Sequence, residues 1–361
     1  MTGNEKRLSL LESLSCAFGP TGCEGAVAGR ILKEIYPYAH GITKDRMGNM
    51  VARMRFGNGD DPTRVMISAH MDEVGMMVTE VREDGTLLFD TVGGIDLSVL
   101  AGRRVTVGDE RGQIPGVIAS KAVHHKDKEE RKKAAPIKKL YIDIGAGDKE
   151  EAEKFASVGS FATFESEFYT FGADGDTVKG KALDDRAGCA VMIETMRALS
   201  EDPPAEDLEL YFCFTVREET GLSGAGPVAE RIAPHLALVL ECTAVADIEG
   251  VEKARQVARL GGGGAISLMD RSTVYPRALC EFALSLAKER EIPAQIKQYV
   301  SGGNDAGHIH KSGAGIPTLA LSIPTRYLHS PACVASLGDY DAVCRLTEAI
   351  LRNCKCMGGN Q

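Results

Sequence analysis

The chain has 361 residues, which is long for a single hydrophobic core, so we expect one large domain that carries a smaller one. Its apolar fraction of 43% and its charged fraction of 26% are typical of a folded globular protein and argue against a disordered chain. The formal net charge of −9 repels phosphate groups and anionic lipid heads, so we expect neither nucleic acid nor a membrane as a partner.

The first residues and the cysteines indicate where the protein works. The N-terminal segment carries charges through its short apolar stretch, and therefore lacks the apolar run of a secretory signal. Ten cysteines are scattered without CxxC spacing, and Cys354 and Cys356 form the one close pair. Most of the others lie in apolar runs, where a free cysteine behaves as a small hydrophobic residue. We therefore predict a cytoplasmic protein with reduced thiols.

Two helices and a strand are predicted in the first part of the chain. Apolar residues recur at helical spacing over residues 5–17 and 25–36, and the segment GPTG (19–22) interrupts the pattern between them. The next apolar run, TRVMISAHMD (63–72), is rich in β-forming residues and ends in polar ones. We therefore expect a buried strand that presents polar side chains at its carboxyl end.

The pattern changes over residues 74–166. Short alternating apolar and polar stretches, separated by glycine turns, predict a small inserted β domain. Within it, residues 121–139 carry dense charge of both signs and few apolar side chains, which indicates an exposed loop. Residues 1–73 and 167–361 are then left to form the larger domain together.

After residue 180, predicted helices and strands alternate. The helical pattern and the apolar runs predict helices over 184–199, 226–232, 275–291 and 339–351, and strands over 207–216, 236–242, 295–300 and 316–324. Such an alternation is typical of an α/β sandwich. The fold class of the larger domain is therefore α/β.

Acidic and imidazole side chains recur where predicted strands end. His70 and Asp72 lie two residues apart at the end of the first buried strand, so both point to the same side of the sheet. Glu218 and Glu219 directly follow the second such strand, and Glu241 ends the third. One of two adjacent glutamates can bind a metal ion while its neighbour takes a proton from water, and Glu219 and Glu218 fit these two roles.

Two further groups join this pattern. Asp184 and Asp185 precede a predicted helix, where they either bind a cation or cap the helix, and His329 follows the last apolar strand. Because α/β sheets bind ligands outside the carboxyl ends of their strands, we expect these side chains to converge. Histidine and carboxylate ligands without cysteine suit zinc, cobalt or manganese, and two histidines with three or more acids can hold two ions.

The predicted substrate-binding residues are Arg326, His308 and Gly303. Arg326 could favour an acidic first side chain of a substrate or pair with a buried carboxylate, and we favour the pairing. His308 and His310 lie with Gly303 in the loop GGNDAGHIH, where the histidines could bind metal, line the pocket or cap turns. We favour pocket lining or a structural role.

Taken in chain order, these motifs resemble those of the M42 metallo-aminopeptidases, which include glutamyl, tetrahedral and deblocking aminopeptidases. The resemblance spans nearly the whole chain and rests on SAHMDEVG, KALDDRAG, VREETGLSGA, the acid after LALVL, GGNDAGHIH and PTRYLHSP. It implies a mixed-sheet α/β/α domain like that of the zinc exopeptidases, with the insertion as a β-barrel-like dimerisation domain. It also implies a homo-oligomer that can extend to a dodecamer built from dimers.

The resemblance further implies a ligand set for two divalent ions, Zn²⁺ or Co²⁺. Asp184 bridges the two ions, His70 and Glu241 complete the site of one ion, and Glu219 and His329 complete the site of the other. Many members of the family have aspartate where this chain has Glu241.

Catalytic roles follow from the same resemblance. Glu218 is then the general base, Asp72 orients His70, and a cis peptide bond follows Asp184. The predicted function is the metal-dependent removal of N-terminal residues from peptides by a water molecule. The alternatives are a metal-dependent hydrolase of dipeptides or N-acyl amino acids, a glycosidase that uses two carboxylates without metal, and a non-catalytic binding protein on the same fold.

Overall fold

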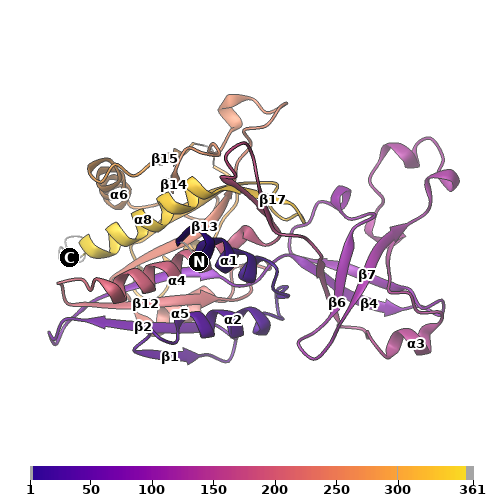
Figure 1. Cartoon of the computed structure of the whole chain (residues 1–361), viewed down its shortest axis with the longest axis horizontal. Helices are drawn as coiled ribbons and strands as arrows, with labels where there is room; N and C mark the ends of the chain where they lie inside the picture. Colours follow the sequence, from indigo (N-terminus) through magenta and orange to yellow (C-terminus); the bar gives the residue numbers. More distant parts are fainter. Residues whose placement is uncertain (1–2, 299, 355–361) are drawn as a thin grey trace.

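The computed structural model describes residues 3–298 and 300–354, which form an α/β body and a β-barrel beside it (Figure 1). The helices are α1 (Gly3–Ser15), α2 (Gly25–Ile35), α3 (Lys149–Glu153), α4 (Leu183–Glu201), α5 (Ala225–Ile232), α6 (Arg277–Glu289), α7 (Ala306–Ile309) and α8 (Leu337–Asn353). The strands of the body are β1 (Gly41–Lys44), β2 (Met50–Phe56), β3 (Thr63–His70), β10 (Tyr169–Phe171), β11 (Thr177–Gly180), β12 (Leu208–Thr215), β13 (Leu236–Ala244), β14 (Gly264–Ser267), β15 (Ala294–Lys297), β16 (Thr318–Arg326) and β17 (Cys333–Ser336).

The strands of the body form one mixed sheet in the order β1-β2-β12-β3-β13-β16-β17-β11-β10, from which β14 and β15 branch at β16. The central strands β12, β3, β13 and β16 are parallel neighbours. Their carboxyl ends therefore meet at one edge of the sheet, where ligands bind in α/β folds. The predicted α/β class is confirmed.

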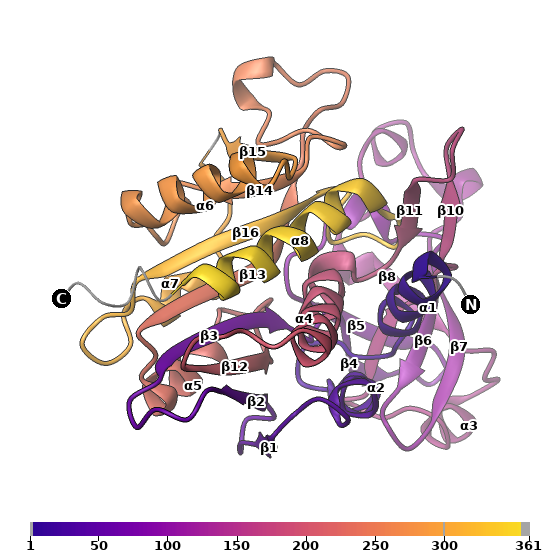
Figure 2. The ribbon, with the colours of Figure 1, turned by 60° about the vertical axis from the view of Figure 1, so that its left-hand side comes forward.

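Helices cover both faces of this sheet (Figure 2). α4 packs on β3 and β13 and is flanked by α1, α2 and α8, while α5 and α7 pack on the opposite face. Strands that are covered on both faces need nearly continuous apolar sequence. β3 fits this rule because every residue from Val65 to His70 is buried.

The inserted segment forms a closed six-stranded barrel in the order β4-β5-β8-β7-β6-β9. Its strands are β4 (Gly75–Val81), β5 (Leu87–Val92), β6 (Arg104–Gly108), β7 (Gln113–Ser120), β8 (Leu140–Asp143) and β9 (Phe161–Phe164). The barrel has an apolar core of its own, separate from that of the body. All of its strands lie within the predicted range 74–166, and the domain boundaries themselves stay a prediction.

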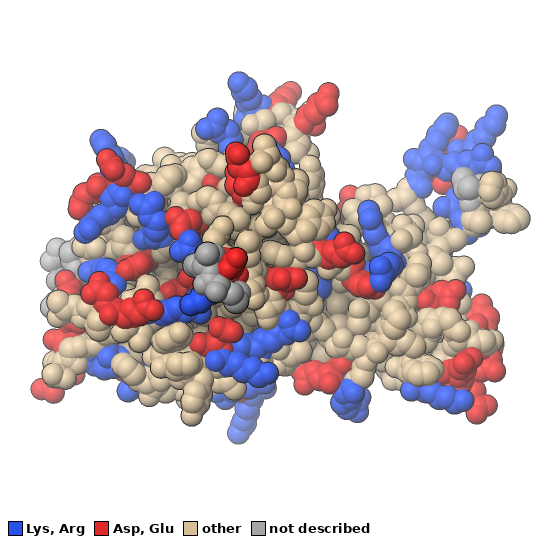
Figure 3. Space-filling model, in the orientation of Figure 1, with Lys and Arg blue, Asp and Glu red and all other residues tan. Residues whose placement is uncertain are grey.

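Both signs of charge are interspersed on the face drawn in Figure 3, and the predicted loop 121–139 is largely exposed. Within the described ranges, no helix combines the length and apolar character needed to cross a membrane. The nine cysteines of these ranges are free thiols, and all of them except Cys16 are buried. Cys356, one of the predicted close pair, lies outside the described residues.

Candidate active site

The ends of the parallel strands bring the predicted residues together. His70 is the last residue of β3 and pairs in register with Thr215, the last residue of β12. Glu218 and Glu219 follow β12 after a left-handed turn at Arg217 (φ 59°). The prediction that Glu241 ends its strand is wrong, because the residues after it continue to pair with β16, and β13 runs on to Ala244.

Asp184 and His329 approach the same place from a helix and a loop. Asp184 lies in the first turn of α4, and the predicted cis peptide bond to Asp185 is confirmed. Both alternatives for this aspartate pair are found in the structure, and Asp185 also belongs to a group of possible metal ligands with His70 and Glu241. Asp185 caps the helix by accepting from the amide of Gly188 (3.1 Å), while Asp184 faces the histidines. His329 lies in the loop between β16 and β17.

The carboxylate of Asp184 lies between the two histidines. Its Oδ1 atom is 3.4 Å from Nε2 of His70, and its Oδ2 atom is 3.5 Å from Nε2 of His329. His70 Nε2 also lies 3.4 Å from Oε1 of Glu241, and His329 Nε2 lies 3.3 Å from Oε2 of Glu219. Two groups of possible metal ligands therefore share Asp184. Glu218 stands further back, with its Oε2 atom 3.9 Å from His70 Nε2.

Both histidines present the same ring nitrogen to the carboxylates. Nδ1 of His70 is bound to the carbonyl oxygen of Asp72 (3.1 Å), and Nδ1 of His329 is bound to the carbonyl oxygen of Gly94 (2.7 Å). A carbonyl only accepts, so each Nδ1 carries a proton, and a ring that gives up its other proton when metal binds offers the lone pair of Nε2. This is the tautomer that a metal ligand needs.

Negative charge is crowded in this site. Burial raises the pKa of Glu219 and of Glu241 to about 8, and nearby Asp184 adds to both shifts. Burial and the adjacent carboxylates also raise the pKa of Glu218. Burial opposes the charging of His329, yet Asp184 and Glu219 outweigh it and raise the pKa of His329 to about 9. Each shift shows that positive charge is scarce among the buried carboxylates.

The donor set fits divalent metal ions. Asp184 Oδ1 is buried and accepts no hydrogen bond from the described residues, which is costly for a carboxylate unless a cation lies beside it. The possible ligand atoms form clusters in which all atoms lie within 4.8 Å of one another, among them His70–Glu218–Glu219 and Asp184–Glu219–His329. Nitrogen and oxygen donors of this kind suit zinc and related ions.

Asp72 supports more of the site than His70 alone. Its carboxylate accepts hydrogen bonds from the amides of Glu218 (3.1 Å) and Glu219 (3.2 Å) and from the hydroxyl of Thr21 (2.7 Å). Its Oδ1 atom lies 3.4 Å from Nδ1 of His70. One buried carboxylate therefore fixes both the turn of the two glutamates and the N-terminal segment.

Sequence reasoning missed a buried ion cluster behind the site. The ammonium of Lys181 lies 2.5 Å and 2.7 Å from the two carboxylate oxygens of Glu73, and Arg186 lies 3.3 Å from the same carboxylate. All three side chains are at least 95% buried. They flank His70 and Asp184 in sequence. The presence of charged residues beside His70 and beside Asp184 was the signal in the sequence that could have predicted an ion pair between the two motifs.

The site opens into a cavity of about 460 Å³. Its lining includes Asp184, Glu218, Glu219, Glu241 and His329 from the ligand set, together with Lys297, Leu328 and the loop 301–304, to which Gly303 belongs. The other two predicted substrate-binding residues do not line this cavity. Arg326 binds Asp247 through two hydrogen bonds (2.7 Å and 3.0 Å), and His308 is exposed on α7 beside Gly226 of α5.

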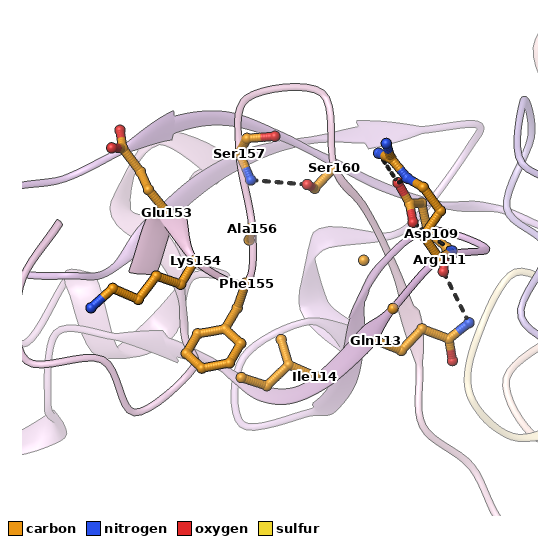
Figure 4. A pocket seen from close by; sticks show the side chains of 12 residues that line it. Asp109, Arg111, Gln113, Ile114, Glu153, Lys154, Phe155, Ala156, Ser157 and Ser160 are labelled. Carbon is orange, nitrogen blue, oxygen red and sulfur yellow. Dashed lines mark hydrogen bonds and ion pairs between the residues drawn. The ribbon is translucent and has the colours of Figure 1, made fainter. Parts of the chain in front are cut away.

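A second cavity, of about 380 Å³, lies on the barrel (Figure 4). The side chains of Ile114 and Phe155 and the Asp109–Arg111 pair are found there, and none of the predicted site residues lines it. It is therefore separate from the histidine–carboxylate site.

A cluster of histidines and largely buried carboxylates at the strand ends of an α/β sheet is the arrangement expected of a metal-dependent hydrolase. The profile of the family described as M42 glutamyl aminopeptidase matches residues 48–346. The chain therefore belongs to this family of metal-dependent aminopeptidases, and the predicted resemblance is confirmed.

Relatives and solved structures agree with this assignment. A relative from Acetivibrio thermocellus, provisionally named an aminopeptidase, is 38% identical over 96% of this chain and 99% of its own length. The lysyl aminopeptidase of Pyrococcus furiosus is 30% identical over 91% of this chain and 90% of its own.

Two solved structures are similar over nearly their whole length. The TET aminopeptidase from a marine sediment Thaumarchaeota archaeon is similar with a TM-score of 0.92 at 35% identity, covering 98% of this chain and 97% of that one. The TET1 peptidase of Pyrococcus horikoshii is described as assembling into a tetrahedron or a large octahedral shell. It is similar with a TM-score of 0.85 at 33% identity, and the similarity covers 96% of this chain and 99% of that one.

Proposed function

We propose that the chain is a two-metal aminopeptidase that removes N-terminal residues from peptides. One observation carries this proposal, namely that the two oxygens of Asp184 face Nε2 of His70 and Nε2 of His329. In this assignment His70, Glu241 and Asp184 would hold one ion, and His329, Glu219 and Asp184 would hold the other. Zinc and cobalt suit these donors best.

The ions would supply Lewis acidity when bound, which polarises the scissile carbonyl and lowers the pKa of a water molecule. The protein supplies the proton transfers. Glu218 lines the cavity and stands further from His70 than Asp184 and Glu241 do, so its carboxylate is available to accept a proton from water. It then returns that proton to the amine that leaves. Burial and the neighbouring carboxylates raise the pKa of Glu218, which favours uptake of the proton by its carboxylate.

Asp72 keeps this arrangement in place. It holds the amides of Glu218 and Glu219, so the proton carrier and its neighbouring ligand cannot move independently. The carbonyl contacts at Nδ1 of His70 and His329 fix the two rings in the tautomer described above.

A substrate panel tests the proposed function. Purified protein would be stripped with a chelator, and zinc, cobalt or manganese would then be restored before assay with aminoacyl p-nitroanilides. We expect free-amine substrates to be cleaved only after metal is restored, and an N-acetylated control to be left intact. Cleavage of the acetylated substrate would favour the N-acyl hydrolase, and inactivity with every metal would contradict the enzyme assignment.

The role of Glu218 has its own variant. Glu218→Gln keeps the shape of the side chain but cannot accept the proton, so we expect kcat to fall by about 10²-fold to 10⁴-fold while both ions stay bound. Metal content by mass spectrometry of the folded protein checks the second part. Full activity in a metal-loaded variant would show that another group takes the proton.

We also infer a cytoplasmic homo-oligomer built from dimers through residues 74–166. Support comes from the assembly described for the similar Pyrococcus horikoshii peptidase and from apolar side chains on the barrel surface. Phe155 is 55% exposed and Val158 is 66% exposed, and such exposure is often covered by a partner subunit. The free thiols of the described residues suit a reducing compartment. Light scattering that gave the mass of a single chain would contradict the assembly.

A further inference from the structure

Lys297 brings a positive charge into the cavity of the active site. It is the last residue of β15 and pairs in register with Ser267 of β14. Its ammonium group donates to the carbonyl oxygen of Ser301 (3.2 Å), which anchors the end of the side chain beside the loop 301–304. The same cavity is lined by Glu218 and by the proposed metal ligands.

No carboxylate within the described part of the chain forms an ion pair with Lys297, whereas two other cations close to the site have such a partner. Lys181 is paired with Glu73, and Arg326 is paired with Asp247. Burial lowers the pKa of the Lys297 amine, although the more distant Asp270, Glu241 and Asp184 favour its charged form. Burial of a lysine is rare in folded proteins unless a partner offsets its charge.

Bound metal ions would take up the carboxylates that share the cavity with Lys297. Two divalent ions carry four positive charges, and they would offset the four carboxylates of Asp184, Glu218, Glu219 and Glu241 that line the cavity with Lys297. A carboxylate from a ligand would then find an ammonium donor at hydrogen-bonding distance in a partly desolvated place, where such pairs are strong.

We propose that Lys297 binds the side-chain carboxylate of the substrate's first residue, so that the enzyme prefers peptides that begin with glutamate or aspartate. This inference rests on the proposed aminopeptidase function. Family membership does not fix which first residue is preferred, because the family is described as M42 glutamyl aminopeptidase whereas one relative is a lysyl aminopeptidase. Lys297 replaces Arg326 as the selecting residue, since Arg326 is paired with Asp247 and does not line the cavity.

The test compares glutamyl and glutaminyl p-nitroanilide. These substrates have the same shape and no carboxylate other than the glutamyl side chain, so a difference cannot arise from recognition of a C-terminus. We expect the metal-loaded wild type to favour the glutamyl substrate in kcat/KM by about tenfold or more, as a hydrogen bond between charged groups allows. Lys297→Met should abolish this preference and lower kcat/KM for the glutamyl substrate by about tenfold to a hundredfold.

Two controls isolate the charge of Lys297. Circular dichroism and the metal content of Lys297→Met check that the variant folds and holds its metals, and leucyl p-nitroanilide should lose less kcat/KM than the glutamyl substrate does. Lys311→Met removes another lysine, exposed after α7 and outside the cavity lining, and should keep the wild-type preference. Lys297→Glu should move the preference towards lysyl p-nitroanilide.

The outcomes separate the two proposals. A wild type that cleaves leucyl substrate but does not favour glutamyl over glutaminyl substrate would overturn the role of Lys297 and leave the aminopeptidase function intact. An unchanged preference in Lys297→Met would do the same. A wild type that cleaves no aminoacyl substrate with any metal would overturn the proposed function and the inference with it.

Discussion

Arg186 offers a strong test of how the active site is held together. Its guanidinium donates to the carbonyl oxygens of Met71 (2.5 Å), Leu14 (2.8 Å) and Gly19 (3.0 Å) and lies 3.3 Å from Glu73. These acceptors belong to the end of α1, the turn after it and the segment that follows β3. Arg186→Met keeps the unbranched apolar stem but removes every donor. We predict a large loss of stability.

The structure sets the size of this loss. A buried acceptor left without a donor costs about 1–3 kcal/mol, and breaking a buried ion pair costs about 3–5 kcal/mol. Glu73 keeps Lys181 as a partner, and water reaches part of the loop after α1, so the separate costs do not add. We expect the free energy of unfolding of Arg186→Met to fall by about 3–5 kcal/mol.

Urea unfolding of the chelated protein, followed by circular dichroism, measures this change. The matched control is Arg277→Met, because Arg277 pairs with Glu281 on the surface of α6, and its side chain is 89% exposed. We expect the control to unfold at the wild-type urea concentration. A loss below about 1 kcal/mol for Arg186→Met would refute the reasoning, because it would mean that the buried cluster contributes little.

Two further predictions concern the metal centre. Asp72→Asn places an amide where two backbone amides now donate, so metal affinity should fall by about tenfold to a hundredfold, measured by competition with a chromophoric chelator; unchanged affinity would exclude a supporting role for Asp72. The second concerns pH. The folded, metal-free chain holds protons on His329 up to a pKa of about 9 and on Glu219 and Glu241 up to about 8, above their ordinary values of 6.5 and 4.5. The folded state therefore binds more protons than the unfolded chain, so the free energy of unfolding of chelated protein should fall from pH 6.5 to pH 9, and bound metal should remove this trend. A rise in stability over that interval, measured by urea unfolding with and without metal, would contradict these shifts.

The convergence of the site could be predicted because it depends on one rule. Parallel strands that are covered on both faces are nearly all apolar, so the first charged residues after each run mark its carboxyl end. His70, Glu218 and Glu219 followed this rule. Glu241 is an exception to the rule, because it lies inside β13, which continues to Ala244. Its charge is tolerated there because the other side chains of the site lie beside it.

Other contacts depend on partners that are far apart in the chain. Lys181 finds Glu73 across 108 positions, and sequence pattern alone places both only near turns. Arg326 was a reasonable candidate for substrate recognition until its partner was known, because nothing near Asp247 indicates that the two side chains meet. Lys297 was overlooked for the opposite reason. A lysine at the end of a short polar strand resembles any surface lysine, and only the cavity sets it apart.

The barrel takes part in the active site as well as lying beside it. Gly94, just after β5 of the barrel, supplies the carbonyl that fixes the ring of His329 across 235 positions. Its neighbour Gly93 has a φ of 85°, and a Cβ atom there would lie 2.8 Å from Val74 and 3.4 Å from Glu219. A side chain at position 93 would therefore push the segment away from the body and loosen the contact to His329. Since one proposed ligand depends on this contact for its tautomer, a body without the barrel would lack part of the proposed metal site.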